Sequence, residues 1–255
     1  MLRLPEDGPL AKSLLAAIHT GDVDGLLRLL CDHPAAGNAI VERRPCGPNP
    51  AFAYPLVAAT ADYPGHFPRV AETIRALVAA SADVNAPCEG RHRETALHWA
   101  ASCDDVEALD ALLDAGASIE APGAVIAGGT PLDDAVAFAQ WQAARRLVER
   151  GAQMAVWHAA ALGRVELLES YFADDAPAAK YPWGATRPSA PLHIAFWCAC
   201  HGVQRAAAEW LLARGADVNW VAPWDGSSPL DAARRSGGND LVRWLEGMGG
   251  KAALA

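Results

Sequence analysis

The stretch Thr95-Ala-Leu-His-Trp-Ala100 decides the fold, because versions of it recur along the chain. All versions have leucine at the third position and alanine at the sixth, and the others are Tyr54-Pro-Leu-Val-Ala-Ala59, Thr130-Pro-Leu-Asp-Asp-Ala135, Ala190-Pro-Leu-His-Ile-Ala195 and Ser228-Pro-Leu-Asp-Ala-Ala233. A phrase that recurs about every 33 residues is typical of stacked-repeat proteins, whose repeats contact only their neighbours. We therefore predict one elongated domain over residues 1–255.

A second phrase, Gly-Ala, follows apolar pairs such as Leu112-Leu113. Thr130 can cap a helix through its hydroxyl, and Pro131 suits the first helical turn, where its missing N–H needs no partner. Further along, Gly151 can adopt the left-handed conformation that ends a helix for roughly 1 kcal/mol less than alanine. One repeat is therefore predicted to form a helix, a turn, a second helix and a stop.

Together the two phrases resemble the ankyrin repeat from about Leu10 to Trp244. The resemblance implies an inner helix at the first phrase, an antiparallel outer helix that ends at the leucine pair, and β-hairpin fingers between repeats. We predict an all-α solenoid of about seven helix-turn-helix units with short β-hairpin fingers. The units are 10–34 (N-terminal cap), 54–85, 95–119, 130–152, 154–172, 190–219 and 228–245 (C-terminal cap).

Five irregularities interrupt this pattern. Residues 63–68 form a Pro-rich aromatic insertion between two helices, and no finger separates Gly151 from Met154. Residues 38–53 and 173–189 are long Pro-rich connections. In the sixth unit, counting forward from the first phrase and backward from the leucine pair gives registers that differ by about one helical turn.

Composition limits the classes of partner. The chain is 52% hydrophobic and 20% charged, as expected of a folded protein, and its formal net charge is -9. A negative chain is a poor match for nucleic-acid phosphates or an anionic membrane, which attract Lys and Arg.

No secretory signal or membrane-spanning stretch is evident, and the six cysteines are interpreted as free thiols. We expect a cytoplasmic monomer, and the Ala-, Gly-, Pro- and Arg-rich composition suggests a bacterial source.

The resemblance also implies a binding surface. In ankyrin proteins the concave groove is built from finger tips, the residue before the first phrase and the two residues after its alanine pair. Carried over position by position, this selects Arg91, His92, Arg93, Glu94, Ser102, Cys103, Phe138, Leu162, His201, Trp220 and Trp224. For the sixth unit the forward count gives Trp197 and Cys198 instead of His201. We predict a scaffold that binds a protein or peptide partner and uses no cofactor, metal or catalytic residue.

An alternative function is an enzyme, or a small-molecule or metal-binding protein, with a pocket near Cys198, Cys200, His201 and the aromatic loop 173–189. On a helix only Cys198 and His201 share a face, and no second ligand pair of zinc-site spacing is present. Cys103 or Cys198 could act as a nucleophile beside His201. By contrast, His98 and His193 are expected to hydrogen-bond to loop backbone, as histidines at this position commonly do in ankyrin proteins.

Overall fold

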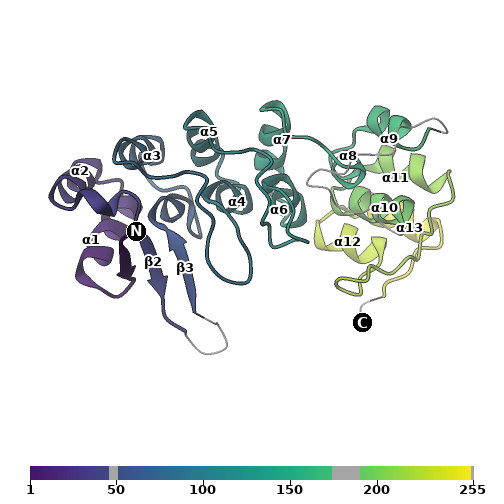
Figure 1. Ribbon diagram of the computed structural model, residues 1–255. Helices are drawn as coiled ribbons and strands as arrows, with labels where there is room; N and C mark the ends of the chain where they lie inside the picture. The colour runs from purple at the N-terminus through teal and green to yellow at the C-terminus, as the bar shows by residue number, and fades with distance from the viewer. Residues whose placement is uncertain (46–50, 174–189, 254–255) are drawn as a thin grey trace. The chain divides into compact units, whose positions relative to one another are not determined.

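The computed structural model describes residues 1–45, 51–173 and 190–253. The chain divides into two compact units, Met1–Ala152 and Gln153–Ala255 (Figure 1). Each unit is a stack of helix pairs, so the predicted helical repeat fold is confirmed. The single continuous domain stays a prediction. Among the described residues, none of the helices is both long enough and apolar enough to cross a membrane.

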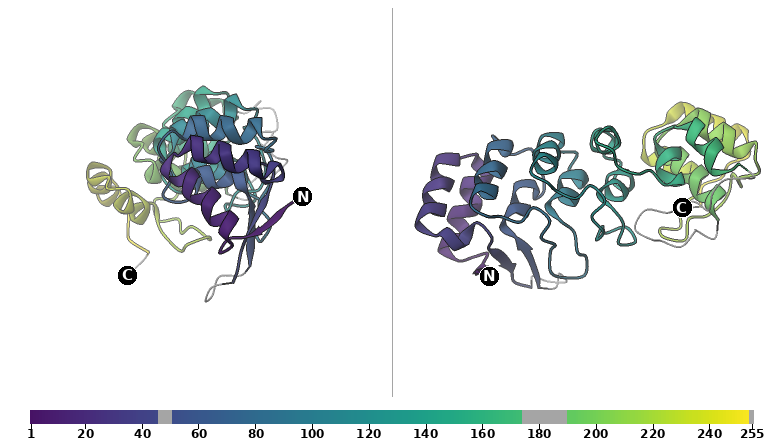
Figure 2. Two further views of the ribbon diagram at one scale, coloured as in Figure 1. Left: turned by 90° about the vertical axis from the view of Figure 1, so that its left-hand side faces the viewer. Right: turned by 45° about the horizontal axis from the view of Figure 1, so that its top comes forward.

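The first unit holds two rows of helices. Neighbours within each row contact one another, and the rows can be followed in the two views of Figure 2. The inner row comprises α1 (Pro9–Thr20), the 3₁₀-helix η2 (Leu56–Ala61), α4 (Ala96–Ser102) and α6 (Pro131–Ala137). The outer row comprises α2 (Val23–Asp32), α3 (Val70–Ala79), α5 (Val106–Asp114) and α7 (Trp141–Glu149), and the short 3₁₀-helix η1 (Pro34–Ala36) follows α2.

A three-stranded sheet occupies part of the stretch that the sequence analysis treated as a connection. Strand β1 (Arg3–Pro5) pairs in parallel with β2 (Ile40–Arg43), which pairs antiparallel with β3 (Phe52–Pro55). The hairpin β2–β3 projects from the side of the unit opposite α3 (Figure 1). Its β-branched and aromatic residues suit a half-buried pleated surface, which the all-α prediction missed. As a result, Tyr54 and Pro55 lie in a strand, and a 3₁₀-helix replaces the α-helix predicted there.

The first phrase forms helices because its polar residues close their N-termini. Thr95 and His98 form a capping box at α4, and Thr130 and Asp133 do the same at α6. The leucine at the third position and the alanine at the sixth are buried in these helices, so Leu97 and Leu132 have no exposed surface. The phrase therefore specifies both the start of the helix and its buried face.

Fingers are joined from one repeat to the next by an asparagine. The Asn85 side chain donates to the Gly116 carbonyl at 3.0 Å and accepts the Ser118 N–H at 2.7 Å. Asn219 repeats this arrangement with the Gly249 carbonyl at 3.1 Å and the Lys251 N–H at 2.7 Å. Each asparagine thereby joins its own finger to the segment that follows the next outer helix.

The second unit also has an inner and an outer row. The inner helices are α8 (Val156–Ala161), α10 (Pro191–His201) and α12 (Pro229–Arg235), and the outer helices are α9 (Val165–Tyr171), α11 (Arg205–Leu212) and α13 (Asn239–Gly247). Helix α10 has 11 residues, whereas α12 has seven. The additional turn lies at the N-terminus of α10, so counting forward from Pro191 places the repeat one turn too early. Counting backward from Leu211-Leu212 gives the correct register. Phe196 is fully buried, while Leu192 of the phrase is only half-buried.

Candidate interaction surface

Seven of the eleven predicted contact residues lie in the first unit, beginning with a finger formed by residues 85–95. Its base is closed by a hydrogen bond of 2.7 Å from the Cys88 N–H to the Glu94 carbonyl. Glu89 exchanges two backbone hydrogen bonds with Ala53, which fastens the finger to β3. Arg91 and Arg93 are exposed, and His92 is half-buried. The finger thus presents cationic side chains from a fixed base.

Glu94 marks the boundary between this finger and α4. It is half-buried, and burial raises the pKa of its carboxyl group, opposed by a hydrogen bond from Trp99. The Trp99 ring lies 5.9 Å from the Phe52 ring and 5.4 Å from the Tyr54 ring, measured between centroids. Glu94 therefore belongs to a packed aromatic cluster at the base of the finger as well as to the predicted surface.

Ser102 and Cys103 lie at the C-terminal end of α4; the insertion of residues 63–68 packs against Cys103, and the Ser102 carbonyl accepts the Gln140 side-chain amide at 2.8 Å. His66 Nε2 lies 3.0 Å from the Cys103 carbonyl, and the His66 N–H donates to Asp105 at 2.5 Å. Burial raises the pKa of the Cys103 thiol to about 11, so this thiol is protonated at neutral pH. Cys103 is therefore a half-buried packing residue and a poor nucleophile.

Phe138 forms the apolar part of the first unit's surface. It follows α6 directly, and its side chain is 44% exposed. The finger of the same repeat carries two further exposed apolar residues, Val125 (38%) and Ile126 (41%). Below that finger, Asp134 accepts the Ile126 N–H at 3.4 Å from a fully buried position. The surface therefore combines a cationic finger with an apolar one.

An aromatic cluster dominates the surface of the second unit. The Trp224 side chain is 51% exposed and meets Trp197 edge-on, with 5.1 Å between ring centroids. Trp220 is half-buried and lies 5.6 Å from Trp224 and 6.2 Å from His193. Packing fixes Trp224 without covering it, which is the arrangement that exposed aromatic contact residues have at interfaces.

The remaining two predicted residues are less accessible. Leu162 caps the end of α8 and is half-buried. His201 is only 5% exposed because its ring stacks on Trp197 at 5.3 Å. His201 thus packs inside the second unit and does not present a side chain to a partner. Trp197 was given only by the forward count, and it supports Trp224 from a buried position.

The repeat pattern has a direct counterpart among known proteins. Residues 56–156 match a family model described as ankyrin repeats in three copies. Residues 56–156 therefore belong to the ankyrin-repeat family. Among solved structures, the ankyrin repeat domain of human ASB11 is similar, with 22% sequence identity over 76% of this chain and 69% of that chain and a TM-score of 0.39. No curated protein sequence matches. Ankyrin repeats are in general protein–protein interaction modules.

The thiols suggested for an alternative site are packed in the interior of the second unit. Cys198 and Cys200 are both buried, and burial raises the pKa of the Cys200 thiol above its ordinary range. Within residues 1–45, 51–173 and 190–253, no three His, Cys, Asp or Glu side chains are grouped so that they could hold a metal ion. Residues 174–189 of the aromatic loop lie outside the described part of the chain.

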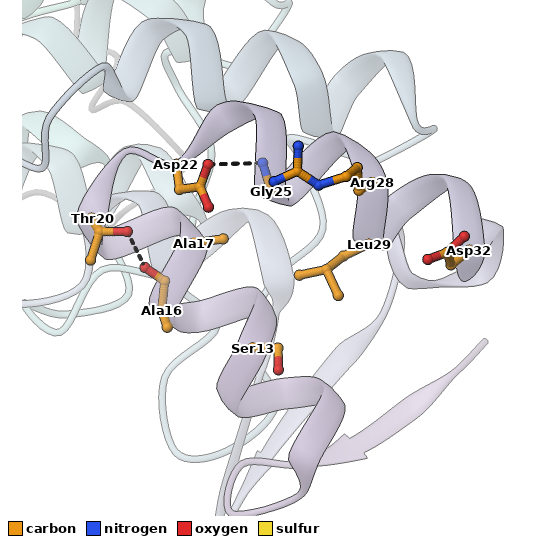
Figure 3. Close-up of a pocket in the computed structure, with 9 residues that line it drawn as sticks. All are labelled: Ser13, Ala16, Ala17, Thr20, Asp22, Gly25, Arg28, Leu29 and Asp32. Carbon is orange, nitrogen blue, oxygen red and sulfur yellow. Dashed lines mark hydrogen bonds between the residues drawn. The ribbon is translucent and has the colours of Figure 1, made fainter.

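A hollow between α1 and α2 was not expected from the sequence (Figure 3). It has a volume of about 450 Å³ and is lined by small residues such as Ser13 and Ala16, with Arg28 at its edge. Two of its polar side chains form hydrogen bonds with the backbone of their own helices. Asp22 accepts the Gly25 N–H at 2.9 Å, and the Thr20 hydroxyl donates to the Ala16 carbonyl at 2.7 Å. The Asp22 contact is the N-terminal cap of α2, so this hollow is explained by helix packing.

Proposed function

We propose that this ankyrin-repeat protein is a scaffold that binds a protein or peptide partner through the surface formed by its fingers and the ends of its inner helices. The observation that carries the proposal is the exposure of large apolar side chains at fixed positions, namely Phe138 and Trp224. Aromatic residues are among those that dominate binding hot spots.

The proposal includes the cellular setting. The described cysteines, including the exposed Cys31, are free thiols, which is consistent with a reducing compartment. The proposed setting is the cytoplasm and the proposed state a monomer, and the formal net charge of -9 opposes a nucleic-acid partner. The enzyme alternative has weaker support, because Cys198, Cys200 and His201 are all buried.

Site-specific photocrosslinking tests the proposal. A photoreactive phenylalanine analogue would replace Phe138 or Trp224, and a third variant would carry it at Leu27. Leu27 is a suitable control because it is 47% exposed on the outer helix α2. We expect peptides selected from a random library to crosslink at positions 138 or 224. Crosslinking that occurs only at position 27 would refute the proposed surface.

A further inference from the structure

The two fingers of the third and fourth repeats enclose a pocket, here called the finger pocket. Its volume is about 730 Å³, and it lies in the first unit between residues 85–95 and residues 118–128. The lining residues on which its chemistry depends are Arg91, His92, Arg93, Ala121, Pro122 and Val125. The lining contains two arginines, one histidine and no acidic residue.

The walls of the finger pocket are held by hydrogen bonds. Asn85 joins the two fingers, as described above, and the second finger is closed by the Gly123 N–H, which lies 3.0 Å from the Gly128 carbonyl. The fingers also touch directly: a Cβ atom on Gly123 would lie 2.2 Å from the Arg93 carbonyl oxygen. The pocket is therefore a feature of the folded repeats and is ready to receive a ligand with little rearrangement.

The arginines of this pocket are available for a ligand. Both Arg91 and Arg93 are exposed, and neither forms an ion pair with another residue that the structure describes. The nearby carboxylate of Glu89 is occupied by Arg3, with contacts of 2.7 and 3.2 Å. Free guanidinium groups bind carboxylates in a two-pronged geometry, and these bonds are stronger than hydrogen bonds between neutral groups.

Charge and polarity together indicate the kind of ligand. The chain as a whole has a formal net charge of -9, so this cationic pocket is a local exception. Its opposite wall is apolar, with Ala121, Pro122 and Val125. A segment of Asp or Glu with adjacent apolar residues matches both walls, whereas the overall negative charge opposes a nucleic-acid backbone.

We propose that the finger pocket binds an acidic peptide segment of a protein partner, with Arg91 and Arg93 holding its carboxylates and Val125 contacting its apolar residues. This proposal rests on the scaffold function proposed above and adds the chemical class of the partner. It also assigns the pocket a role in specificity, because a basic or neutral segment offers the two guanidinium groups no carboxylate to bind.

Selection of peptides tests this proposal. A library of random 12-residue segments, displayed within a loop so that no free carboxyl terminus is present, is selected against the whole protein. We expect enriched segments to carry net negative charge. The double variant R91E/R93E should weaken their binding at least about tenfold, and replacing their acidic residues by lysine should restore binding to that variant. A matched control, R28E/R145E, makes the same charge change at exposed outer-helix positions and should weaken binding less than about threefold.

The outcomes separate the two proposals. Enriched segments that are neutral or basic, or that bind R91E/R93E normally, would overturn the acidic-peptide proposal while leaving the scaffold function intact. A failure to enrich any segment would count against both proposals. A single-stranded 12-nucleotide DNA that binds more tightly than every segment, and is lost in R91E/R93E, would assign the pocket to phosphate instead. Circular dichroism melting of each variant establishes that it is folded.

Discussion

Trp197 takes the place in the sixth repeat that His98 has in the third. His98 Nδ1 accepts the Thr95 N–H, so its Nε2–H points to the Gly129 carbonyl at 3.4 Å. The Trp197 indole N–H donates to the Ser227 hydroxyl at 3.1 Å. Gly129 and Ser227 each directly precede the N-terminal cap of the next inner helix. One buried ring N–H thus joins neighbouring repeats in both units, although the residue type differs.

Replacing Trp197 by phenylalanine should destabilise the second unit. The change removes the hydrogen bond to Ser227 from a position that is 7% exposed, so we expect a loss of about 1 to 2 kcal/mol in the free energy of unfolding. Urea denaturation followed by circular dichroism measures it. Trp244→Phe is the control, because Trp244 is half-buried on the outer helix α13 and its contact is with the Arg205 guanidinium. Equal losses in the two variants would show that the Ser227 hydrogen bond contributes nothing.

Val203 has a backbone conformation that is unfavourable for a β-branched residue. Its φ is 58°, and it follows the C-terminal cap of α10 directly. Gly163 and Gly237 occupy the corresponding places in the fifth and seventh repeats, with φ of 71° each. The left-handed region costs a non-glycine residue roughly 1 to 2 kcal/mol. Substitution by glycine should relieve part of this strain.

We therefore expect Val203→Gly to raise the melting temperature by about 2 to 4 °C, since glycine's own entropic cost offsets part of the gain. Differential scanning calorimetry provides the measurement. Val242→Gly, inside helix α13, should lower the melting temperature. If Val203→Gly lowers it by a similar amount, the conformation at Val203 is not strained.

Asp134 should make the stability of the first unit depend on pH. Burial, together with the nearby charge of Glu94, raises the pKa of its carboxyl group from 3.8 to about 8. Its Oδ2 atom is buried and has no hydrogen-bond partner among the described residues. Between pH 4 and 8 the folded state therefore keeps a proton that the unfolded state has lost, so stability falls as pH rises through this range.

Asparagine at position 134 removes this titration and can still accept the Ile126 N–H. We expect Asp134→Asn to be about 1 to 3 kcal/mol more stable than the original protein at pH 8, with a difference that shrinks toward pH 4. Urea titrations at several pH values test this. Glu107→Gln, on the exposed side of α5, should keep the original pH dependence. An Asp134→Asn variant whose stability has the same slope against pH would contradict the account.

The sequence predicted the elements that are specified by a short repeated phrase, and it missed those that depend on pairing between distant segments. The helix pairs followed from Leu97 and its counterparts, because burial at a fixed period specifies repeating helices. The sheet did not follow, since β1 and β2 join residues 3–5 to residues 40–43 and neither segment belongs to the repeated phrase. The extra turn of α10 was visible only as a conflict between two counts, and only the structure showed which count was correct.

The repeat pattern predicted where each residue of the candidate surface lies in its repeat, but it did not predict which of these side chains are exposed. Exposed Arg91 and Trp224 lie on fingers, where the sequence placed them, whereas His201 is covered by Trp197. Position within a repeat predicts which helix end a residue occupies. It does not predict which neighbouring ring covers that residue, because the residue type at the covering position varies: Trp197 stacks on His201 from the place that His98 occupies in the third repeat.

Binding of library-selected peptides to Phe138→Ala and Leu27→Ala tests the central claim most directly. The two residues are similarly exposed, at 44% and 47%, and they lie on an inner-helix end and an outer helix of the same unit. We predict that Phe138→Ala raises the dissociation constant at least about fivefold, corresponding to about 1 kcal/mol, while Leu27→Ala leaves it unchanged. A dissociation constant that rises for Leu27→Ala and stays unchanged for Phe138→Ala would contradict the account.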